Sequence, residues 1–339
     1  MRWKRLFWEI NRAGREETLK NSSRSWRSSR FENIMRVLVK VPATTANLGP
    51  GFDALGLALD LWNEAEFIPA SDGEISLVVQ GEGSDKLPTD AGNAVAKAAL
   101  QIYDLAGKRC SGLRIHCRNR VPLSSGLGSS SAAMLAGMLG ANAILGGPFS
   151  PEEILKLAIE TEGHPDNVAP AMLGGLVASI IHDSHVVSLR LMLGGQRTPI
   201  HITVVVPDFD FPTEGARAIL PKQIERRDAI YNISRAVIVT EAFRLGDLDM
   251  LGEAMTDKLH QPYRLPLIPG AQAAMEAMKQ AGASAVALSG AGPGLIAFSS
   301  KRETAIGRAG QRAFAESGLT SRAFQLKISR KGAEVHKNF

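Results

Sequence analysis

The sequence predicts an α+β protein of two domains, each with strands and helices. Stretches with alternating apolar residues recur in both halves of the chain, and stretches with apolar residues at helical spacing lie between them. In addition, 339 residues with 45% hydrophobic and 22% charged residues suit two globular domains of ordinary size. We place a basic, disordered leader at residues 1–35 and the two domains at 36–197 and 198–335.

The elements of the first predicted domain follow one another from residue 36. A loop rich in Gly and Pro separates the first strand from a second strand or short helix. The helix predicted at 151–163 has a start signal, with Ser150 as N-cap and Pro151 at the first position. The other predicted strands and helices are strands 36–41, 74–83 and 112–122 and helices 93–107 and 132–145.

The second predicted domain begins with the strand "HITVVVP" at 201–207. Helical patterns then dominate to Gly282, and the segment 283–300 predicts a strand, a glycine-rich turn and another strand. Because strands and helices interleave in both halves, we expect two mixed α/β layers.

The positive charge of the chain is concentrated in the leader. Residues 1–34 contain nine Lys or Arg and four Glu, whereas the remainder has 30 basic and 30 acidic residues. We therefore expect no nucleic-acid partner for the folded body. The leader lacks the continuous apolar stretch of a secretory signal or a membrane span, so we expect no membrane partner. We interpret it as an upstream start-site extension or a disordered tail, with a transit peptide as the alternative.

The two cysteines, Cys110 and Cys117, lie seven residues apart with no CxxC pattern and no cluster of metal ligands around them. They form neither a disulfide framework nor a zinc motif. This usage fits a reducing, cytoplasmic setting.

Three glycine-rich stretches need a common explanation, and the first is "GLGSSS" at 126–131, before the helix predicted at 132–145. Free N–H groups at a helix N-terminus, flexible glycines and serine hydroxyls together form an anion cradle suited to phosphate. No Lys follows the glycines, as a Walker A loop requires, and the third Gly of a dinucleotide fingerprint is missing. A well-capped turn is the alternative for this stretch taken alone.

The other two stretches are "ATTANLGPGFD", in which Asn47 and Asp53 flank a Gly-Pro-Gly turn, and "SGAGPG" at 289–294 between two short apolar strands. Taken singly, the first reads as a turn capped by its own Asn and Asp, and the second as a hairpin turn. Three such loops on one compact chain are harder to explain as ordinary turns.

These motifs resemble, in the same order, those of the GHMP small-molecule kinases. "PLSSGLGSSSAA" (122–133) is similar to the phosphate-binding motif of the family, with Ser131 where Ala is usual. "KVPATTANLGPGFDALGLAL" (40–59) and "SGAGPG" resemble its N-terminal and C-terminal motifs. Within the family, "PATTANLGPGFD", "GHPDNVAPAMLGG" (163–175) and "HQPYR" (260–264) resemble the homoserine kinases. The resemblance runs from about residue 36 to near the C-terminus.

The resemblance implies a two-domain fold, with an N-terminal mixed α/β domain that carries the phosphate loop and a C-terminal ferredoxin-like domain. It also implies ATP and Mg²⁺ as cofactors and L-homoserine as the small-molecule substrate. The implied reaction is phosphorylation of the L-homoserine hydroxyl to O-phospho-L-homoserine, a step of threonine biosynthesis. Members of the family are commonly homodimers, and the sequence itself does not decide this.

The resemblance also assigns the substrate side of the site residue by residue. Arg217 and Arg264 match arginines that bind the carboxylate, for which a guanidinium is suited. Asp53 with Asn47 matches the ammonium side. The substrate-binding residues implied are Asn47, Asp53, His164, Arg217, Arg264 and Gly290, and the catalytic ones are Asn167, nearest the hydroxyl, and Thr213, near the transferred phosphate.

The ATP-binding residues implied are Pro122, Leu123, Ser124, Ser125, Gly126, Leu127, Gly128, Ser129, Ser130, Ser131 and Ala132. Magnesium needs a carboxylate, which in this family comes from the helix before the substrate segment. The commonest spacing falls near Lys156, so we expect Glu160 and Glu162 jointly as ligands, together with Ser129.

Mevalonate kinases of the same family place an Asp, the candidate base, where Asn167 stands here. An amide cannot take the proton, so we expect direct attack by the hydroxyl without a protein base. We expect the neighbouring Asp166 to face solvent or to cap the following segment rather than to catalyse.

Three alternatives compete with this interpretation. Another GHMP kinase, acting on mevalonate or a diphosphocytidyl sugar alcohol, is disfavoured by Asn167 and by the pair Arg217 and Arg264. A GHMP-fold protein that binds a ligand without catalysis is disfavoured because both the phosphate motif and the substrate motif are intact. A basic nucleic-acid-binding module is disfavoured by the neutral charge of the body.

Overall fold

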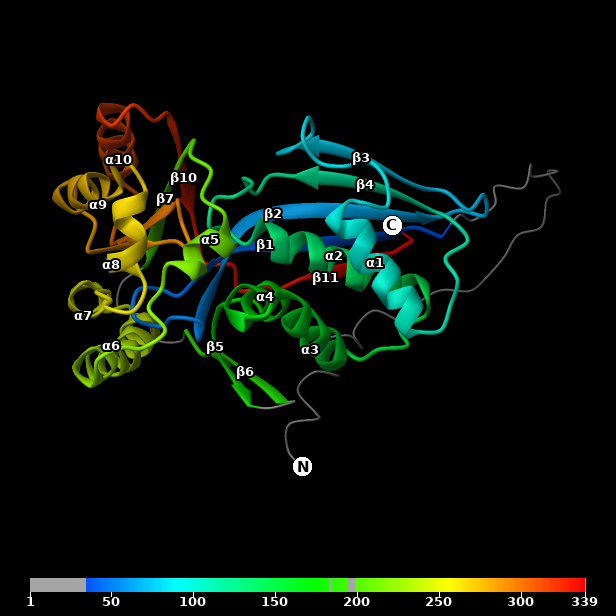
Figure 1. Cartoon of the computed structure of the whole chain (residues 1–339), viewed down its shortest axis with the longest axis horizontal. Coiled ribbons are helices and arrows are strands. Elements are labelled where there is room, and N and C mark those ends of the chain that lie inside the picture. Colours follow the sequence, from blue (N-terminus) through cyan, green and yellow to red (C-terminus); the bar gives the residue numbers. More distant parts are fainter. Residues whose placement is uncertain (1–34, 183–184, 194–198, 339) are drawn as a thin grey trace, which may run out of the picture. The chain divides into compact units, whose positions relative to one another are not determined.

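A computed structural model describes residues 35–182, 185–193 and 199–338. The leader predicted at 1–35 therefore lies, apart from Met35, outside the described residues. The described chain forms two β-sheets with helices packed on them (Figure 1). None of the helices in this part of the chain has both the length and the apolar character that a bilayer span requires.

The first sheet contains seven of the strands that the structure describes, with the central order β11-β1-β2-β4-β3. β5 lies off this path and pairs with both β2 and β6. All strand pairs of this sheet are antiparallel except β3 and β4, which are parallel. The segment after the loop that contains the Gly-Pro-Gly turn, predicted as a strand or a short helix, is the long strand β2. The strands are β1 (Val37–Ala46), β2 (Leu55–Pro69), β3 (Ile75–Gly81), β4 (Leu113–Asn119), β5 (Leu176–His182), β6 (His185–Leu191) and β11 (Glu334–Lys337).

Four helices belong to the first sheet: α1 (Ala94–Leu105), α2 (Ser129–Ile144), α3 (Pro151–Glu162) and α4 (Pro165–Leu173). The α2 and α4 helices pack directly on β1 and β2, and α1 packs against α2. Gly140 of α2 lies against the ring of the buried Phe67, where a Cβ would overlap the ring. The absence of a side chain therefore lets α2 approach the sheet closely.

The start of α3 agrees with its sequence signal. The Ser150 hydroxyl accepts the N–H of Glu153, and the Glu153 carboxylate accepts the N–H of Ser150. This capping box satisfies two N–H groups that the helix cannot pair internally. It fixes where the helix begins, at Pro151, 13 positions before His164.

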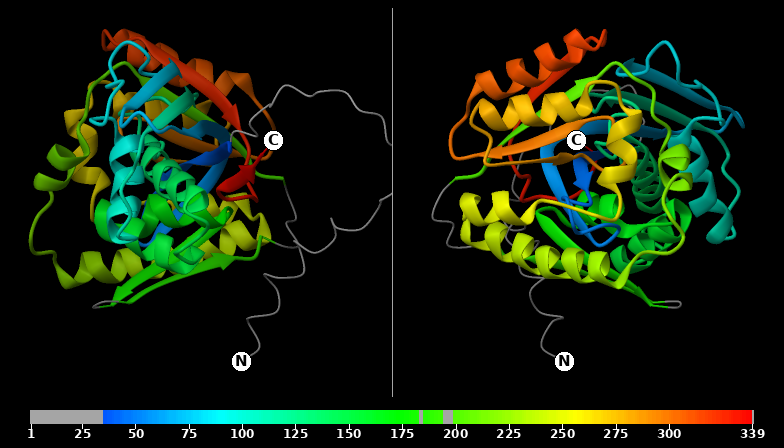
Figure 2. Two further views of the ribbon diagram at one scale, coloured as in Figure 1. Left: turned by 90° about the vertical axis from the view of Figure 1, so that its right-hand side faces the viewer. Right: turned by 60° about the vertical axis from the view of Figure 1, so that its left-hand side comes forward.

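The second sheet has four antiparallel strands in the described chain, in the order β10-β7-β9-β8. With α6 between β7 and β8 and α10 between β9 and β10, this is the βαββαβ order of a ferredoxin-like layer. Figure 2 shows α9 and α10 side by side on this sheet. The strands are β7 (His201–Pro207), β8 (Ala285–Leu288), β9 (Leu295–Ser299) and β10 (Ser321–Leu326).

The helices of this half are α5 (Thr213–Ala218), α6 (Arg226–Leu245), α7 (Leu248–Ala254), α8 (Gln261–Arg264), α9 (Ala271–Gln280) and α10 (Thr304–Glu316), with the 3₁₀ turn η1 (Leu265–Leu267) after α8. One apolar core joins the two sheets, because Leu57 and Leu59 of β2 cluster with Val204 of β7 and Phe243 of α6. The last strand, β11, returns to β1 in the first sheet. The predicted domain limits at 36–197 and 198–335 stay a prediction.

Candidate active site

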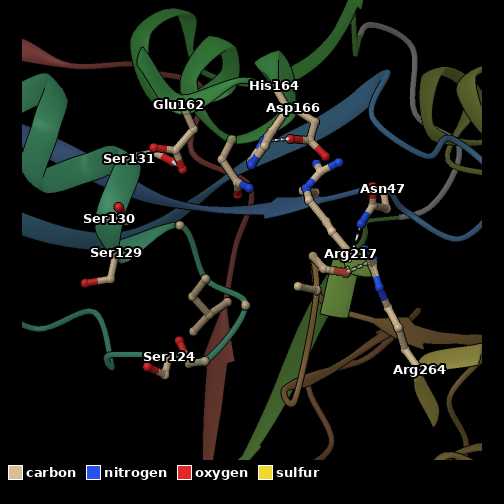
Figure 3. Close-up of a pocket in the computed structure, with 18 residues that line it drawn as sticks. Asn47, Ser124, Ser129, Ser130, Ser131, Glu162, His164, Asp166, Arg217 and Arg264 are labelled. Carbon is tan, nitrogen blue, oxygen red and sulfur yellow. Dashed lines mark hydrogen bonds and ion pairs between the residues drawn. The ribbon is translucent and has the colours of Figure 1, made fainter. Parts of the chain in front are cut away.

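A cavity of about 180 Å³ collects most of the residues that the sequence singles out (Figure 3). Serines of the glycine loop lie on one side of it, and His164, Asp166, Arg217 and Arg264 lie on the other (Figure 3). The predicted site residues that line it are Asn47, Ser124, Ser125, Gly126, Leu127, Gly128, Ser129, Ser130, Ser131, Glu162, His164, Asn167, Arg217, Arg264 and Gly290.

Six predicted residues do not line this cavity. Asp53 is held just outside it by Arg217, and Ala132 is buried inside α2. Pro122 and Leu123 line a second cavity, described below. Glu160 faces outward and pairs with Lys156. Thr213 begins α5, but its side chain lies outside the described residues.

The glycine loop ends in a helix N-terminus that is open to the cavity. Gly128 is the N-cap of α2 with φ of 68°, and Gly126 has φ of 75°, values that favour glycine. Among the described residues, no side-chain hydrogen bond caps this helix end, so the first-turn N–H groups stay available at the cavity wall. Together with the serine hydroxyls and the helix dipole, these groups form an anion-binding cradle.

The three glycine-rich stretches meet here. The Ser289 hydroxyl donates to the carbonyl of Gly126 over 2.7 Å, and the N–H of Gly290 donates to the carbonyl of Ala46 over 3.2 Å. Asn47 Nδ2 donates to the carbonyl of Gly290 over 2.8 Å. These bonds make one connected backbone structure of three loops that are far apart in sequence.

Opposite the cradle, Arg217 and Asp53 form a paired, two-hydrogen-bond contact. Arg217 Nη1 and Nη2 donate to the two carboxylate oxygens of Asp53 over 3.0 and 2.7 Å. The N–H of Asp53 in turn donates to Asn47 Oδ1. The hydrogen bond with Asp53 raises the pKa of Arg217 above its usual value, although burial opposes this. The pair joins two residues predicted to bind opposite ends of one substrate.

Arg264 is the most deeply placed charge of the site, with 1% of its surface exposed. Its Nε donates to the carbonyl of Ala216, and its Nη1 lies 3.2 Å from His260 Nδ1. Burial, together with the nearby charge of Arg217, lowers the pKa of Arg264 to about 10. Arg264 therefore remains a cation at neutral pH and presents its charge from within the fold.

Sequence reasoning missed the group that holds Arg264. Asp257 accepts the backbone N–H of His260 over 2.9 Å and that of Gln261 over 2.6 Å at the start of α8. His260 also contacts the carbonyl of Gly49 through Nε2, and burial lowers its pKa, which favours the neutral ring. A neutral ring that donates from Nε2 leaves Nδ1 as an acceptor for Arg264. The quoted motif "HQPYR" contains His260, but its pattern alone does not indicate that His260 accepts a hydrogen bond from Arg264.

The expectation that Asp166 faces solvent or caps the following segment is wrong. Asp166 is 2% exposed, lines the cavity, and lies 2.7 Å from His164 Nδ1. Burial alone would lower the pKa of His164, but the hydrogen bond and charge of Asp166 raise it above its usual value. The pair lies at the start of α4, where the helix dipole favours an acidic residue.

Asn167 lines the cavity one residue further along α4, and its Oδ1 accepts the hydroxyl of Thr44 over 2.8 Å. Thr44 lies on β1, is fully buried and was not singled out from the sequence. The motif "PATTANLG" contains it, but nothing in that pattern shows which of its two threonines reaches α4.

Of the two acidic residues predicted to bind magnesium, only Glu162 lines the cavity. Its Oε1 accepts the hydroxyl of Ser131 over 2.8 Å, while Ser129 and Ser130 stand beside it at the start of α2 (Figure 3). Within the described ranges, no group of three or more His, Cys, Asp or Glu could hold a metal ion by itself. A metal here would need oxygens from a bound phosphate in addition to Glu162, which is how Mg²⁺ is commonly held.

A second cavity of about 670 Å³ adjoins the first through Ser124, which lines both. Its walls include the loop after β3, the residues Pro122 and Leu123, and the segment after β7. The edge is closed by Arg322, which donates to both carboxylate oxygens of Glu82. The two cavities thus adjoin each other at the segment that leads into the glycine loop.

A backbone cradle for an anion beside a small cavity that is lined by two arginines and by carboxylates is the arrangement of a phosphotransferase that acts on a small, charged molecule.

Comparison with known proteins agrees with this class. The family models described as the GHMP kinases N terminal domain and the GHMP kinases C terminal match residues 93–175 and 239–316. The homoserine kinase of Moorella thermoacetica is 46% identical over 299 residues, which cover 88% of this chain and 99% of the relative. That of Carboxydothermus hydrogenoformans is 42% identical over 297 residues, which cover 88% of this chain and 96% of the relative.

A solved structure agrees as well: the crystal structure of homoserine kinase from Cytophaga hutchinsonii superposes with a TM-score of 0.79 at 29% identity, covering 92% of this chain and all of that one. The chain belongs to the homoserine kinases of the GHMP kinase family. This confirms the family, the fold class and the enzyme class predicted from the motifs, and the family implies the use of ATP.

Proposed function

We propose that this chain transfers the γ-phosphoryl group of ATP to the hydroxyl of L-homoserine and releases O-phospho-L-homoserine, in threonine biosynthesis. The observation that carries the proposal is that Arg217 and Arg264 line the cavity across from the glycine loop, with Asp53 paired to Arg217 behind them. A zwitterion with a short hydroxyl arm fits between these charges and the cradle, and the relatives named above are homoserine kinases.

On the substrate side, the carboxylate of homoserine would bind Arg217 and Arg264, and its ammonium group would bind Asp53 with Asn47. Arg217 and Asp53 are already paired with each other. On binding, the ion pair between Arg217 and Asp53 would be replaced by two others, one between Arg217 and the substrate carboxylate and one between Asp53 and the substrate ammonium group. Neither residue would then be left as an unpaired, partly buried charge. A ligand that carries only one of the two charges would leave one partner uncompensated.

On the nucleotide side, the phosphates of ATP would bind the first-turn N–H groups of α2 and the serine hydroxyls of the loop. The second cavity, reached past Ser124, has room for the nucleoside, with Pro122 and Leu123 in its wall. Mg²⁺ would be held by Glu162 and Ser129 together with phosphate oxygens, and it would neutralise charge on the transferred group. Glu160, which faces outward, is not required in this arrangement.

Phosphoryl transfer demands positioning and charge stabilisation more than covalent help from the protein. The cradle would orient the transferred group, and Asn167 would orient the attacking hydroxyl. Asn167 cannot accept a proton, and His164 is engaged by Asp166. We therefore propose direct attack by the hydroxyl, with Thr213 of α5 near the transferred phosphate.

The test is ADP release from the purified protein with Mg-ATP, in parallel with L-homoserine, mevalonate, L-threonine or no acceptor. Release with L-homoserine alone is expected. Release with mevalonate would show that the phosphate loop functions but that the zwitterion subsite is misassigned. The absence of release with every acceptor would favour a binding protein without catalysis.

Two further features of the proposal concern the protein in the cell. We propose a cytoplasmic enzyme, in line with the cysteine usage, and a homodimer, the common state in this family. Fluorescence microscopy of the tagged full chain tests the first, and sedimentation equilibrium tests the second. The neutral charge of the folded body supports small molecules rather than nucleic acids as its ligands.

A further inference from the structure

Thr44 connects the two sides of the site without touching the cavity. It is fully buried near the end of β1. Its backbone N–H donates to the carbonyl of Leu127 in the glycine loop over 3.1 Å. Its hydroxyl donates to Asn167 Oδ1 on α4 over 2.8 Å. One residue therefore bonds both to the loop proposed to hold phosphate and to the side chain proposed to orient the substrate.

The direction of the second bond decides which end of the Asn167 amide faces a ligand. An amide has an acceptor oxygen and a donor nitrogen at opposite ends. Thr44 occupies the oxygen, and in the described part of the chain the amide nitrogen donates to no other protein group. Because Asn167 lines the cavity, the end left for a ligand is the N–H₂ donor.

Gly128 leaves room for this contact. A Cβ at Gly128 would lie against the hydroxyl oxygen of Thr44 and 3.1 Å from Asn167 Oδ1. Any larger residue there would push the two side chains apart. Gly128, the N-cap of α2, therefore also leaves the space in which Thr44 and Asn167 form their hydrogen bond.

We propose that Thr44 is a positioning residue that presents the N–H₂ group of Asn167, rather than its carbonyl, to the reacting groups. The proposal rests on the function proposed above. In the transfer, the hydroxyl oxygen bonds to the γ-phosphorus while the bond from phosphorus to the bridging oxygen breaks. ADP takes that electron pair, and the hydroxyl proton passes to a phosphoryl oxygen. Asn167 donates to the oxygens of this arrangement and accepts no proton.

Two substitutions of Thr44 test this. Thr44→Val, which keeps the branched shape and loses the hydroxyl, should lower kcat about tenfold, because one hydrogen bond that orients a reacting group is lost. KM for L-homoserine and for ATP should stay within about twofold, because binding is carried by other residues. Thr44→Ser, which keeps the hydroxyl, should keep kcat within about twofold of the wild type.

The matched control is Thr203→Val on β7. Thr203 is also a buried strand threonine whose hydroxyl has a side-chain partner, Gln325 Nε2 at 2.8 Å. This variant should lose similar stability in urea unfolding and retain its kcat. If Thr44→Val does not fold, Thr44→Ala takes its place in the same comparison.

A double-mutant cycle with Asn167→Ala separates positioning from general support of the fold. Thr44→Val should slow the wild type and cause no further loss when Asn167→Ala is already present. An equal loss in both backgrounds, an unchanged kcat in Thr44→Val, or a Thr44→Ser variant as slow as Thr44→Val would overturn the proposal. Absence of homoserine phosphorylation in the wild type would instead contradict the proposed function itself.

Discussion

The phosphate side of the cavity is built mainly from backbone, whereas the substrate side is built from side chains. On the phosphate side, Gly126 and Gly128 adopt left-handed conformations, and the N-terminus of α2 supplies N–H groups. On the substrate side, Arg217, Asp53 and Arg264 come from three separate segments and are held by hydrogen bonds and burial.

This difference determines which substitutions each side of the cavity tolerates. A backbone cradle depends on conformation and close approach, so it is sensitive to a single added methyl group. A side-chain subsite depends on charge and reach, so it is sensitive to changes in charge that leave the fold intact. Substitutions on the two sides should therefore change different kinetic constants.

The largest effect is expected on the substrate side, from Arg264→Met. The change removes a buried cation and should lower kcat/KM for L-homoserine about a thousandfold, since a buried charge–charge contact is lost. Phosphorylation of 3-aminopropan-1-ol, which lacks the carboxylate, should change little. ADP binding, measured by calorimetry, should be retained.

The control for that change is Arg244→Met, at an exposed arginine of α6 that pairs with Glu241. It should alter neither rate, because surface ion pairs contribute little. Equal losses with L-homoserine and with 3-aminopropan-1-ol in Arg264→Met would mean that Arg264 supports the fold rather than binds the carboxylate.

The next effect tests the phosphate side. In Gly126→Ala, the new Cβ would run into the carbonyl of Ser289, and the positive φ would be strained as well. KM for ATP should rise about a hundredfold, because the first and third glycine loops would separate.

Gly146→Ala isolates the cost of backbone conformation. Gly146 has φ of 86°, but no atom lies within 4 Å of a Cβ built there. This variant should lose a little stability in thermal unfolding and retain its KM for ATP. If both variants raised KM for ATP alike, close packing of the loops would not be the cause.

A third effect, of about a hundredfold in kcat/KM for L-homoserine, is expected from Asp53→Asn. The amide keeps the shape but removes the charge that pairs with Arg217 and is proposed to bind the ammonium group. With 4-hydroxybutyrate, which lacks the ammonium group, the wild type and the variant should be similar in steady-state assays. A variant that lost both reactions equally would indicate a distorted pocket.

The smallest effect concerns pH. Asp166 raises the pKa of His164 above its usual value, so the charged ring stabilises the fold most below about pH 6.5. As pH rises through the raised pKa, this contribution is lost. The free energy of unfolding lost in His164→Gln should therefore be larger at pH 6 than at pH 9 in urea titrations.

An exposed histidine serves as the control for this pH effect. His116 on β4 has a side chain that is 51% exposed, and His116→Gln should cost little free energy of unfolding in the same titrations, because an exposed ion-pair contact contributes little. A His164→Gln difference that grew toward pH 9 would contradict the sign of the predicted linkage.

The two sides of the site were not equally predictable from the sequence. Glycine and serine before an apolar helix signal a cradle locally, because the residues that build it are adjacent in the chain. A common explanation for the three glycine loops was also expected, since three such loops on one compact chain are hard to explain as ordinary turns. The N-cap at Ser150 was readable too, because the cap and the first turn of its helix are adjacent in the chain.

The substrate side needed the family resemblance, because arginines such as Arg217 and Arg264 carry no local pattern that separates them from surface charges. Residues that act through tertiary contacts were missed: Thr44, Asp257 and the partner role of His260 appear only when β1, α4 and α8 are brought together. Asp166 was misjudged because acidic residues are usually exposed, and its contact with His164 and the nearby charges of Arg217 and Arg264 explain its burial.

The most direct test of the account measures the initial rate of ADP release from the wild type with L-homoserine, 3-aminopropan-1-ol and 4-hydroxybutyrate at equal concentrations. The three acceptors share the hydroxyl and differ only in the two charged groups. We predict rapid release with L-homoserine and release at least about a hundredfold slower with each of the others, since each leaves one charge of the pocket unpaired. Similar rates with all three would contradict a subsite that recognises the zwitterion.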